Sequence, residues 1–570
     1  MKNSISNSNY LSMKHALQSI FLTALLLFVG QSLSADSFVV DGIYYQFADY
    51  YYDIWDEEDE YLYEEGPFVE VTYNIDDYYY SGEVIIPSEV TYEGKTYKVI
   101  GIGNHAFWGC YEMTSLVIPK SLKYIGDDAF NCMEQLTSVN IPEGVRYIGD
   151  QAFFECRSLT QVTISSTVKY IGRDAFLGCD ELNSIVVNDG NKNYDSRDNC
   201  NALIETATNT LITGCKNTII PTSVTTIGSH AFYGQYDLTD ITLPEGLISI
   251  GEDAFEYCSL TSLTIPASLT DINPWSFFLC GQLKEIKVAA GNPKYDNRND
   301  CNAIIETASN KLILGCETTV IPEDITTIGE NAFAFSGFAG TTVPESVTSI
   351  EEWAFDGCKM KQFTIPSGMT QISASTFYGS DLQSIEIPEN ITYIGYNAFG
   401  ACKLTEITIP ETVPNIGTDI LFNCDNLISA VISNSISTLN GTFRSCENLK
   451  YLSLGSGVKC IEDDAFKKCY SLSEFHVNAP VPPTCKDNVL APINKETCIL
   501  YVPEASIDAY RQAEGWKEFK HIEVYSASGI EQMATEAPAS SDTYDIYGRQ
   551  VSEPQPGTLY LRGNRKVLVR

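Results

Sequence analysis

The sequence predicts a solenoid of the β-rich α/β class, and the first observation behind this prediction is a ladder of phenylalanines. Fourteen of them recur at intervals of 21 to 23 residues, interrupted by two gaps of 56. In order they are Phe107, Phe130, Phe153, Phe176, Phe232, Phe255, Phe277, Phe333, Phe355, Phe377, Phe399, Phe422, Phe443 and Phe466. A fixed period of this length is typical of stacked units, none of which can bury its apolar face alone. We therefore expect one elongated body of about fourteen turns.

The second observation is the pattern within one unit, for which residues 136–156 (LTSVNIPEGVRYIGDQAFFEC) serve as the example. The first strand is expected to end at Pro142, a second short strand precedes Gly149, and residues 150–153 predict a short helical turn. The expected inward-facing side chains are Leu136, Val139, Ile141, Val145, Ile148, Ala152 and Phe153. Because like residues recur at each place, stacking should produce ladders of like side chains.

Written as L-x-x-[IV]-x-I-P-x-x-V-x-x-I-G-x-x-A-F-x-x-C, the unit resembles the BspA-like (Treponema-type) leucine-rich repeats of bacterial surface proteins, of Bacteroidetes type, over about residues 84–477. The resemblance implies a right-handed leucine-rich-repeat superhelix. It also implies a surface protein that attaches to host matrix proteins, host cells or other bacteria. The matching residues are core positions, so the resemblance assigns no binding residue.

The composition changes along the chain predict six parts. In order they are a cleavable signal peptide (1–35), an N-terminal cap rich in tyrosine and acidic residues (36–98), the repeat solenoid (99–477), a C-terminal capping module (478–525), a linker (526–542) and a short β tail (543–570). The apolar run at 20–29 after Lys14 is typical of an export signal, which places the mature protein outside the cell or on the outer-membrane surface. No later stretch approaches the ~18 apolar residues that span a bilayer.

Both ends of the solenoid carry local signals of their own. In the cap, Glu93 and Gly94 predict a two-residue hairpin turn. In the capping module, which resembles the closing module behind such repeats, residues 506–513 predict an amphipathic helix. The tail resembles the C-terminal sorting domains of secreted Bacteroidetes proteins.

Each gap of 56 holds an insertion of 33 residues beyond the 23-residue period. The insertions lie near 188–218 and 289–319 and are copies of one another, offset by 101 residues. Residues 202–205 and 210–213 predict two strands around a four-residue loop. The expectation is therefore a solenoid with two β-hairpin insertions.

Eighteen cysteines in an exported chain first suggest a disulfide framework. Most of them instead follow a repeat phenylalanine by two or three residues, at a position where other repeats carry Ser or Gln. A site of that kind predicts small inward-facing thiols. In the insertions, the hairpin register places Cys200 opposite Cys215, and Cys301 opposite Cys316. A cross-strand disulfide is one prediction for each of these pairs, and two unlinked thiols are the other.

A row of basic and aromatic residues is the candidate binding surface. Its members recur at 23-residue spacing, and they are Lys123, Tyr124, Arg146, Tyr147, Lys169 and Tyr170. Because the flanking Val and Ile turn inward, we expect all six side chains on one outer face, with the three rings about one strand spacing apart. Such a row either stiffens the ladder by stacking or contacts a protein or a glycan.

The net charge of −38 excludes nucleic acid as a partner, because the chain repels phosphate backbones. No G-x-S-x-G, H-E-x-x-H, P-loop or C-x-x-C motif occurs, so no catalytic residue, cofactor or metal is expected. The favoured interpretation is a monomeric adhesin that binds a protein and is not an enzyme. A glycan-binding accessory protein of a carbohydrate-uptake system and a structural spacer without a ligand are the alternatives.

Overall fold

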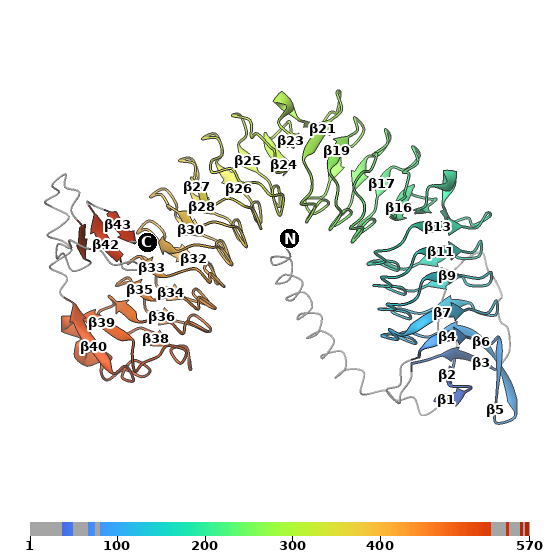
Figure 1. Cartoon of the computed structure of the whole chain (residues 1–570), viewed down its shortest axis with the longest axis horizontal. Helices are drawn as coiled ribbons and strands as arrows, with labels where there is room; N and C mark the ends of the chain where they lie inside the picture. Colours follow the sequence, from blue (N-terminus) through green and yellow to red (C-terminus); the bar gives the residue numbers. More distant parts are fainter. Residues whose placement is uncertain are drawn as a thin grey trace. The chain divides into compact units, whose positions relative to one another are not determined.

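A computed structural model describes residues 37–48, 67–73 and 80–525, together with the backbone of three strands in the tail. The chain forms two compact units, and each is described by itself (Figure 1). The first unit contains residues up to 182 and residues 187–194, and the second contains residues 183–186 and those from 195 onward. The predicted signal peptide and linker lie outside the described residues.

In the first unit, the cap continues the repeat ladder as one sheet. The strands, in order of pairing, are β1 (Ser37–Val40), β2 (Ile43–Phe47), β3 (Phe68–Val71), β6 (Lys95–Ile102), β8 (Tyr124–Ile125), β10 (Tyr147–Ile148) and β12 (Tyr170–Ile171). The first three pair antiparallel and the others pair parallel. The cap therefore covers a strand edge that would otherwise present unpaired N–H and C=O groups.

The predicted hairpin turn in the cap is confirmed. β5 (Glu89–Tyr92) folds back on β6 so that Tyr92 pairs with Lys95, which leaves Glu93 and Gly94 as the turn. Their φ angles are 49° and 79°, the left-handed conformations that a two-residue hairpin requires and that glycine adopts without strain. A second set of parallel strands completes the turns of this unit: β4 (Gly82–Ile85) with β7 (Met113–Val117), and β9 (Ser138–Asn140) with β11 (Gln161–Ile164).

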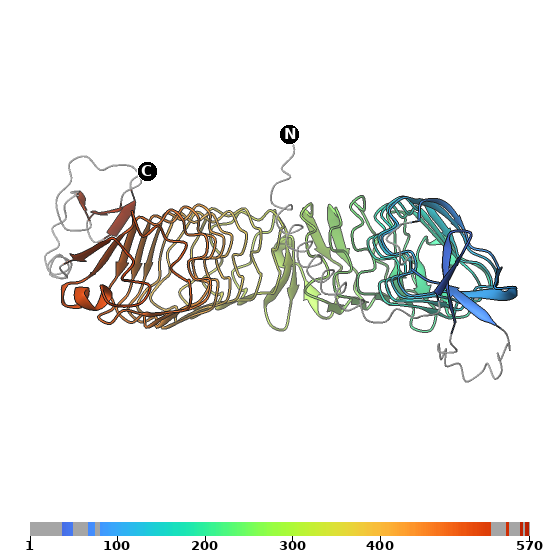
Figure 2. The same cartoon turned by 90° about the horizontal axis from the view of Figure 1, so that it is seen from below.

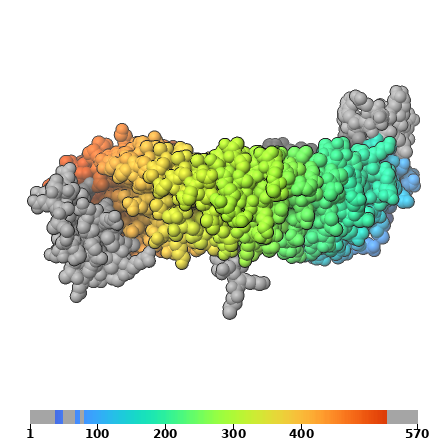
Figure 3. Space-filling model, turned by 90° about the horizontal axis from the view of Figure 1, so that it is seen from above, coloured from blue at the N-terminus to red at the C-terminus, as the bar shows by residue number. Residues whose placement is uncertain are grey.

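The second unit repeats the same two ladders (Figure 2). One ladder consists of the strands at the place where the repeat consensus has Ile-Gly. They are β16 (Thr210–Thr213), β17 (Thr226–Ile227), β18 (Ser249–Ile250), β20 (Asp271–Ile272), β24 (Lys311–Gly315), β25 (Thr327–Ile328), β26 (Ser349–Ile350), β28 (Gln371–Ile372), β30 (Tyr393–Ile394), β32 (Asn415–Ile416), β34 (Thr438–Leu439), β36 (Cys460–Ile461) and β38 (Thr484–Cys485). The strands before the proline are β19 (Ser262–Ile265), β21 (Glu285–Val288), β27 (Gln362–Phe363), β29 (Ser384–Ile385), β31 (Glu406–Thr408), β33 (Ser429–Ile432), β35 (Tyr451–Leu454) and β37 (Glu474–Val477). In the space-filling view the colours of this unit follow one another in sequence order, because each turn packs against the next (Figure 3).

The fold class is confirmed, but over the described residues the solenoid has about 18 turns rather than fourteen. The difference arises because the insertions supply ladder strands of their own. β16 pairs parallel with β17, and β24 pairs parallel with β25, so each hairpin takes the place of a repeat strand. β38 adds a further turn after the last repeat phenylalanine.

The insertions form the predicted hairpins, but their register is shifted by a bulge. β15 (Leu203–Glu205) pairs antiparallel with β16, and the bulge between Leu203 and Ile204 moves the pairing by one residue. Cys215 Sγ consequently lies 3.3 Å from the carbonyl oxygen of Asn201, so the prediction that places Cys200 opposite Cys215 is wrong. The second copy behaves alike: β23 (Ala303–Glu306) pairs with β24 across a bulge between Ile304 and Ile305.

The bulge displaces the second cysteine pair as well. Cys316 Sγ lies 3.6 Å from the carbonyl oxygen of Asn302, not opposite Cys301. All four cysteines of the insertions are free thiols in the structure.

Corners replace the predicted helical turns. In the repeat taken as the example, Gln151 has a φ of 54° and Glu155 a φ of 53°, and other turns repeat this pair of left-handed residues. Asp, Asn, His and Gly tolerate this conformation best, which explains His105 and His230 at the first corner position. Over residues 37–48, 67–73 and 80–525 the helices are η1 (Arg197–Asn199), η2 (Arg298–Asp300), η3 (Glu504–Ser506) and α2 (Ile507–Tyr510), which is shorter than the predicted 506–513.

The phenylalanine ladder fills the core, with ring centroids of successive turns 5.0 to 6.0 Å apart. One assignment is wrong. Leu421 is fully buried at the ladder position of its turn, whereas Phe422 is half-buried beneath the Arg444 guanidinium, 4.2 Å from its ring centroid. A single-residue shift in the motif of this turn, in which Ile420 and Leu421 stand for Ala and Phe, explains the error.

The predicted thiol ladder is present and hydrogen-bonded. All the ladder thiols except Cys110 in the first turn donate to the backbone carbonyl of the core residue one turn earlier, as Cys280 Sγ does to Phe255 O at 3.1 Å and Cys402 Sγ to Phe377 O at 2.9 Å. Cys132 departs from the prediction, because the buried Met133 takes the ladder position and leaves Cys132 half-buried at a left-handed corner with φ 62°.

After the last repeat, β39 (Ile499–Pro503) pairs parallel with β37, and β40 (His521–Tyr525) pairs parallel with β39. The buried Tyr510 donates from its hydroxyl to Ala479 O at 2.9 Å, and the buried Trp516 donates from Nε1 to Pro483 O at 2.9 Å. These contacts fasten the module to the final turn. In the tail, β41 (Thr543–Asp545), β42 (Leu559–Arg562) and β43 (Arg565–Leu568) form an antiparallel sheet.

Candidate functional site

Two of the three predicted surface tyrosines form a stacked pair in the first unit. Tyr147 and Tyr170 are register partners on β10 and β12, and their ring centroids lie 5.0 Å apart at an interplanar angle of 12°. Tyr170 is 45% exposed and Tyr147 is half-buried. The parallel register therefore places a flat aromatic surface on the outside of the ladder.

Tyr124 does not belong to this surface, and the prediction that it faces outward is wrong. Its register partner on β6 is Gly101, whose missing side chain leaves space for the ring: a Cβ there would lie 2.0 Å from Tyr124 Cζ. The ring crosses β6, and its hydroxyl donates to Oε2 of Glu70 on β3 at 2.6 Å, which leaves Tyr124 buried. Tyr124 is therefore packed against the cap.

The three cations flank the tyrosines in the same register. Backbone hydrogen bonds from Lys123 N to Ile100 O, from Arg146 N to Lys123 O and from Lys169 N to Arg146 O hold them one strand apart. All three side chains are half-buried. Burial and the negative charges of Asp150 and Asp127 raise the pKa of Tyr170, and the positive charge of Arg173 opposes them.

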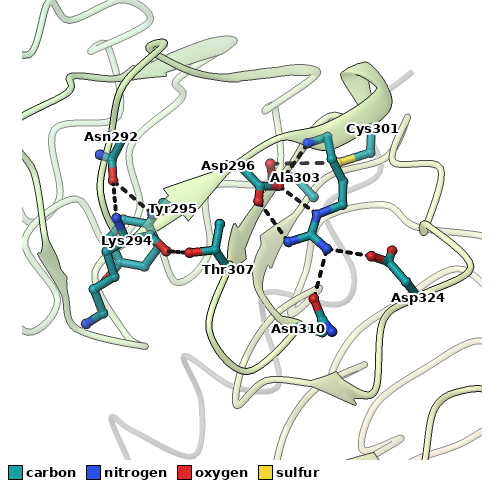
Figure 4. Close-up of polar contacts among 10 residues, drawn as sticks. Asn292, Lys294, Tyr295, Asp296, Cys301, Ala303, Thr307, Asn310 and Asp324 are labelled. Carbon is teal, nitrogen blue, oxygen red and sulfur yellow. Dashed lines mark hydrogen bonds and ion pairs between the residues drawn. The ribbon is translucent and has the colours of Figure 1, made fainter.

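The arginine network of each insertion is a structural feature rather than a site. Arg298 Nε and Nη2 donate to the two carboxylate oxygens of Asp296 at 2.9 and 2.8 Å, and Nη1 donates to Asn310 Oδ1 at 2.8 Å and Asp324 Oδ2 at 2.5 Å (Figure 4). Burial raises the pKa of Asp296, but the hydrogen bonds and charge of Arg298 outweigh it and lower the pKa overall. Arg197 makes the matching contacts with Asp195 and Asn209 in the first copy.

A third feature, which the sequence analysis missed, is a cluster of aromatic rings at the corners of the second unit. We call it the aromatic corner, and it consists of Trp275, Phe278, Phe335, Trp353 and Tyr378. The ring of Trp275 contacts Phe278 at 5.1 Å and Trp353 at 6.5 Å, and Trp353 contacts Tyr378 at 5.7 Å, measured between centroids. The rings come from successive turns and meet because the turns stack.

Polar groups accompany the aromatic corner. Trp275 Nε1 donates to Glu330 Oε1 at 3.1 Å. Asp356 is buried in the same turn as Trp353, and burial raises its pKa well above the usual range. Among the described residues neither of its carboxylate oxygens has a hydrogen-bond partner, and the N–H of the neighbouring Gly357 donates to Tyr378 O.

The sequence did hold a signal for the aromatic corner. Aligning the motifs shows Trp353 at a corner position that carries Asp or Asn in most turns, and Phe335 at one that carries Gly in others. A search for rings at a left-handed corner position that most turns keep small or polar would have found Trp353, whereas the position of Phe335 also holds Tyr257 and Leu279. The hydrophobic pattern alone hides them, because they adjoin the core phenylalanines in sequence.

Over the described part of the chain, no three His, Cys, Asp or Glu side chains gather as a metal ion would require. In the same residues, no helix has the length and apolar character to cross a membrane.

Comparison with known families agrees with the repeat geometry. The model of the BspA type leucine rich repeat region matches in six copies, over residues 84–208, 209–300, 311–428 and 370–484. The chain belongs to this family. The matched region thus extends from β4 of the first unit to the start of β38, and it includes the first insertion and the second except for residues 301–310.

Several solved structures are similar to this chain in part. A leucine rich cell surface protein from Faecalibacterium prausnitzii is 23% identical over 74% of this chain and 94% of its own, with a TM-score of 0.41. A leucine-rich repeat protein from Bacteroides ovatus is 21% identical over 86% of this chain and 100% of its own, with a TM-score of 0.30. The pneumococcal vaccine antigen PcpA is 16% identical over 86% and 99%, with a TM-score of 0.33. No curated protein matches the chain.

Proposed function

We propose that this BspA-type repeat protein is exported, displayed at the cell surface and acts as an adhesin that binds a partner protein. The export signal in the sequence and the family membership support the location. The observation that carries the binding function is the stacked pair of Tyr147 and Tyr170 on the outer face of the first unit.

Two properties make this pair suitable for binding. A stacked, register-fixed ring loses little conformational entropy when a partner covers it, and tyrosine presents both an apolar face and a hydroxyl. The flanking Arg146 and Lys169 add cations, and tyrosine and arginine are residues in which binding hot spots are enriched. Most of the other strand faces carry Thr, Ser, Gln and Glu, which are weaker anchors.

A binding screen of the mature protein, from residue 36 onward, against immobilised matrix proteins and polysaccharides tests this proposal. Replacing both Tyr147 and Tyr170 by Ser should weaken capture of the protein ligand about tenfold or more while the melting temperature stays within a few degrees. Tyr393→Ser is the matched control, since Tyr393 holds the same ladder position and is 41% exposed, but its register partners are Gln371 and Asn415 rather than tyrosines.

The alternatives are distinguished by the same screen. Unchanged capture with a lowered melting temperature would make the pair a structural ladder only. Tyrosine-dependent capture of a polysaccharide instead of a protein would indicate a glycan-binding accessory protein. Failure to capture anything would leave a spacer.

A further inference from the structure

The two insertions are copies, but the corners beside them differ. Aligning the repeat motifs places Trp275, Phe335 and Trp353 beside the second insertion. The residues at the corresponding positions beside the first insertion are Asp174, Gly234 and Asp253. The first copy nevertheless builds the same hairpin, the same arginine pairing and the same phenylalanine stack. The fold therefore does not require the aromatic rings.

The backbone disfavours two of these rings. Phe335 has a φ of 53° and Trp353 a φ of 59°, both in the left-handed region. Bulky side chains rarely adopt this conformation. At the position of Trp353 the other left-handed corners hold smaller or polar residues such as Asp253 and Asn331, whereas the position of Phe335 also holds Tyr257 and Leu279. Residues kept in a disfavoured backbone conformation that smaller residues would relieve are typical of binding sites.

The rings form a shallow surface rather than a closed core. Trp275, Phe335, Trp353 and Tyr378 are each half-buried, so each leaves part of its ring to solvent. Phe335 rests on Gly357, where a Cβ would lie 2.5 Å from the ring. This close contact with Gly357 fixes the orientation of the Phe335 ring.

The charge around the rings is negative, apart from that of Arg444, which acts on Tyr378 and is paired with Asp419 Oδ1 at 2.9 Å. The Glu330 carboxylate already accepts the Trp275 indole N–H, which holds it beside the ring, and Glu352 is exposed next to Trp353. Lys311 pairs with Glu351 at 2.7 Å. The whole chain carries a net charge of −38. An electron-rich aromatic surface in an acidic field attracts cations.

From this combination we infer that the aromatic corner is a second binding site, and that it takes an arginine- or lysine-rich segment of a partner protein. Tryptophan is the best aromatic partner of a cation, and a guanidinium can stack on its face while donating to a neighbouring carboxylate. The net charge steers a basic partner toward the protein. A neutral glycan could use the rings but would gain nothing from the carboxylates or from the net charge.

This site goes beyond the proposed function, because it lies in the second unit and uses neither Tyr147 nor Tyr170. The test uses a fluorescein-labelled peptide of alternating arginine and glycine, titrated with the mature protein and followed by fluorescence anisotropy. A peptide with citrulline in place of arginine has the same shape without the charge. Laminarin, a neutral glucan, serves as the glycan probe in competition.

The decisive variant restores the residues of the first copy: Trp275→Asp, Phe335→Gly and Trp353→Asp together. It adds two negative charges, so attraction by net charge alone predicts equal or tighter peptide binding. The proposed site predicts a dissociation constant raised about tenfold or more, because the rings are gone. Trp353→Asn, which adds no charge and places at this corner the residue found at Asn331 and Asn397, is the second variant if the triple variant does not fold.

The outcomes separate cleanly. Arginine-dependent binding that weakens in the variants, and that Tyr147→Ser with Tyr170→Ser leaves unchanged, supports the site even if the proposed function fails. Peptide binding that is unaltered or tighter in the variants overturns it. Ring-dependent binding of laminarin, with equal affinity for the arginine and citrulline peptides, also overturns it in favour of a glycan.

Discussion

At the level of single residues, Asp356 is a buried carboxyl group at a position where other turns place residues as different as Asn131, Ala334 and Arg444. Burial raises its pKa well above the usual range, so folding favours the protonated form. Stability from such a group is full at low pH, below the pKa of the unfolded chain, and is lost as the pH rises toward the folded-state pKa. The loss amounts to about 1.4 kcal/mol per pH unit within that window.

Asp356→Asn should therefore raise the free energy of unfolding at neutral pH and leave it nearly unchanged near about pH 4. Urea denaturation at both pH values measures the effect. Asp240→Asn, which changes an exposed side chain, is the control and should show no such difference. An equal gain at both pH values would mean that the carboxyl group is not protonated on folding.

Two phenylalanines, one inside the core ladder and one outside it, test which side chains form the core. Phe255 is fully buried and stacks between Phe232 and Phe277, with centroids 5.0 and 5.3 Å away. Phe255→Ala should destabilise the protein by about 3–5 kcal/mol, because it leaves a cavity in the ladder. Phe422→Ala should cost only about 1–2 kcal/mol, since Phe422 is half-buried and outside the ladder. Equal losses in denaturation experiments would restore Phe422 to the core.

At the scale of the element, the insertions show how a hairpin can replace a repeat turn. The long side chain of Arg298 ties the segment before β23 to the loop between β23 and β24, through Asp296 and Asn310. Each bond is charge-assisted and only partly exposed to solvent, which makes it stronger than a surface ion pair.

Arg298→Ala should therefore destabilise the second insertion by about 1–3 kcal/mol and speed hydrogen exchange in β23 and β24. Arg511→Ala is the control, because its pairing with Asp508 is largely exposed and should contribute little. Faster exchange spread evenly over the whole second unit would contradict a local role for Arg298.

The elements that were predicted well share one property, which is that neighbouring residues determine them. The turn at Glu93 and Gly94 and the strands of the insertions follow from local sequence, and the structure contains both. The bulge beside Ile204 depends on how the hairpin fits against β17, a contact between distant segments, so the register could not be read from the pattern. The prediction that Tyr124 faces outward failed for the same reason, because its hydroxyl is bound by Glu70 from the cap.

At the scale of the whole molecule, the period determines the architecture but not the site. Stacking places any residue of one turn beside its counterpart in the next, and this fixed the pairing of Tyr147 with Tyr170 in advance. The contacts of the aromatic corner do not follow from stacking alone, because its rings come from different positions of the motif and meet across the second insertion. A departure from the repeat at one position becomes informative only when its neighbours in space are known.

The whole chain also makes a prediction about its sulfur chemistry. Eighteen free cysteines occur in the structure. Burial raises the pKa of thiols such as Cys258 and Cys446, which keeps them protonated and unreactive in the folded protein. Maleimide labelling without reductant should therefore modify few cysteines in the native mature protein. After denaturation it should modify at least the ten of the ladder: Cys110, Cys156, Cys179, Cys258, Cys280, Cys358, Cys402, Cys424, Cys446 and Cys469. If freshly prepared protein released almost no thiols on unfolding, the ladder would be paired by disulfides, and the stacked thiol hydrogen bonds could not be what holds these positions.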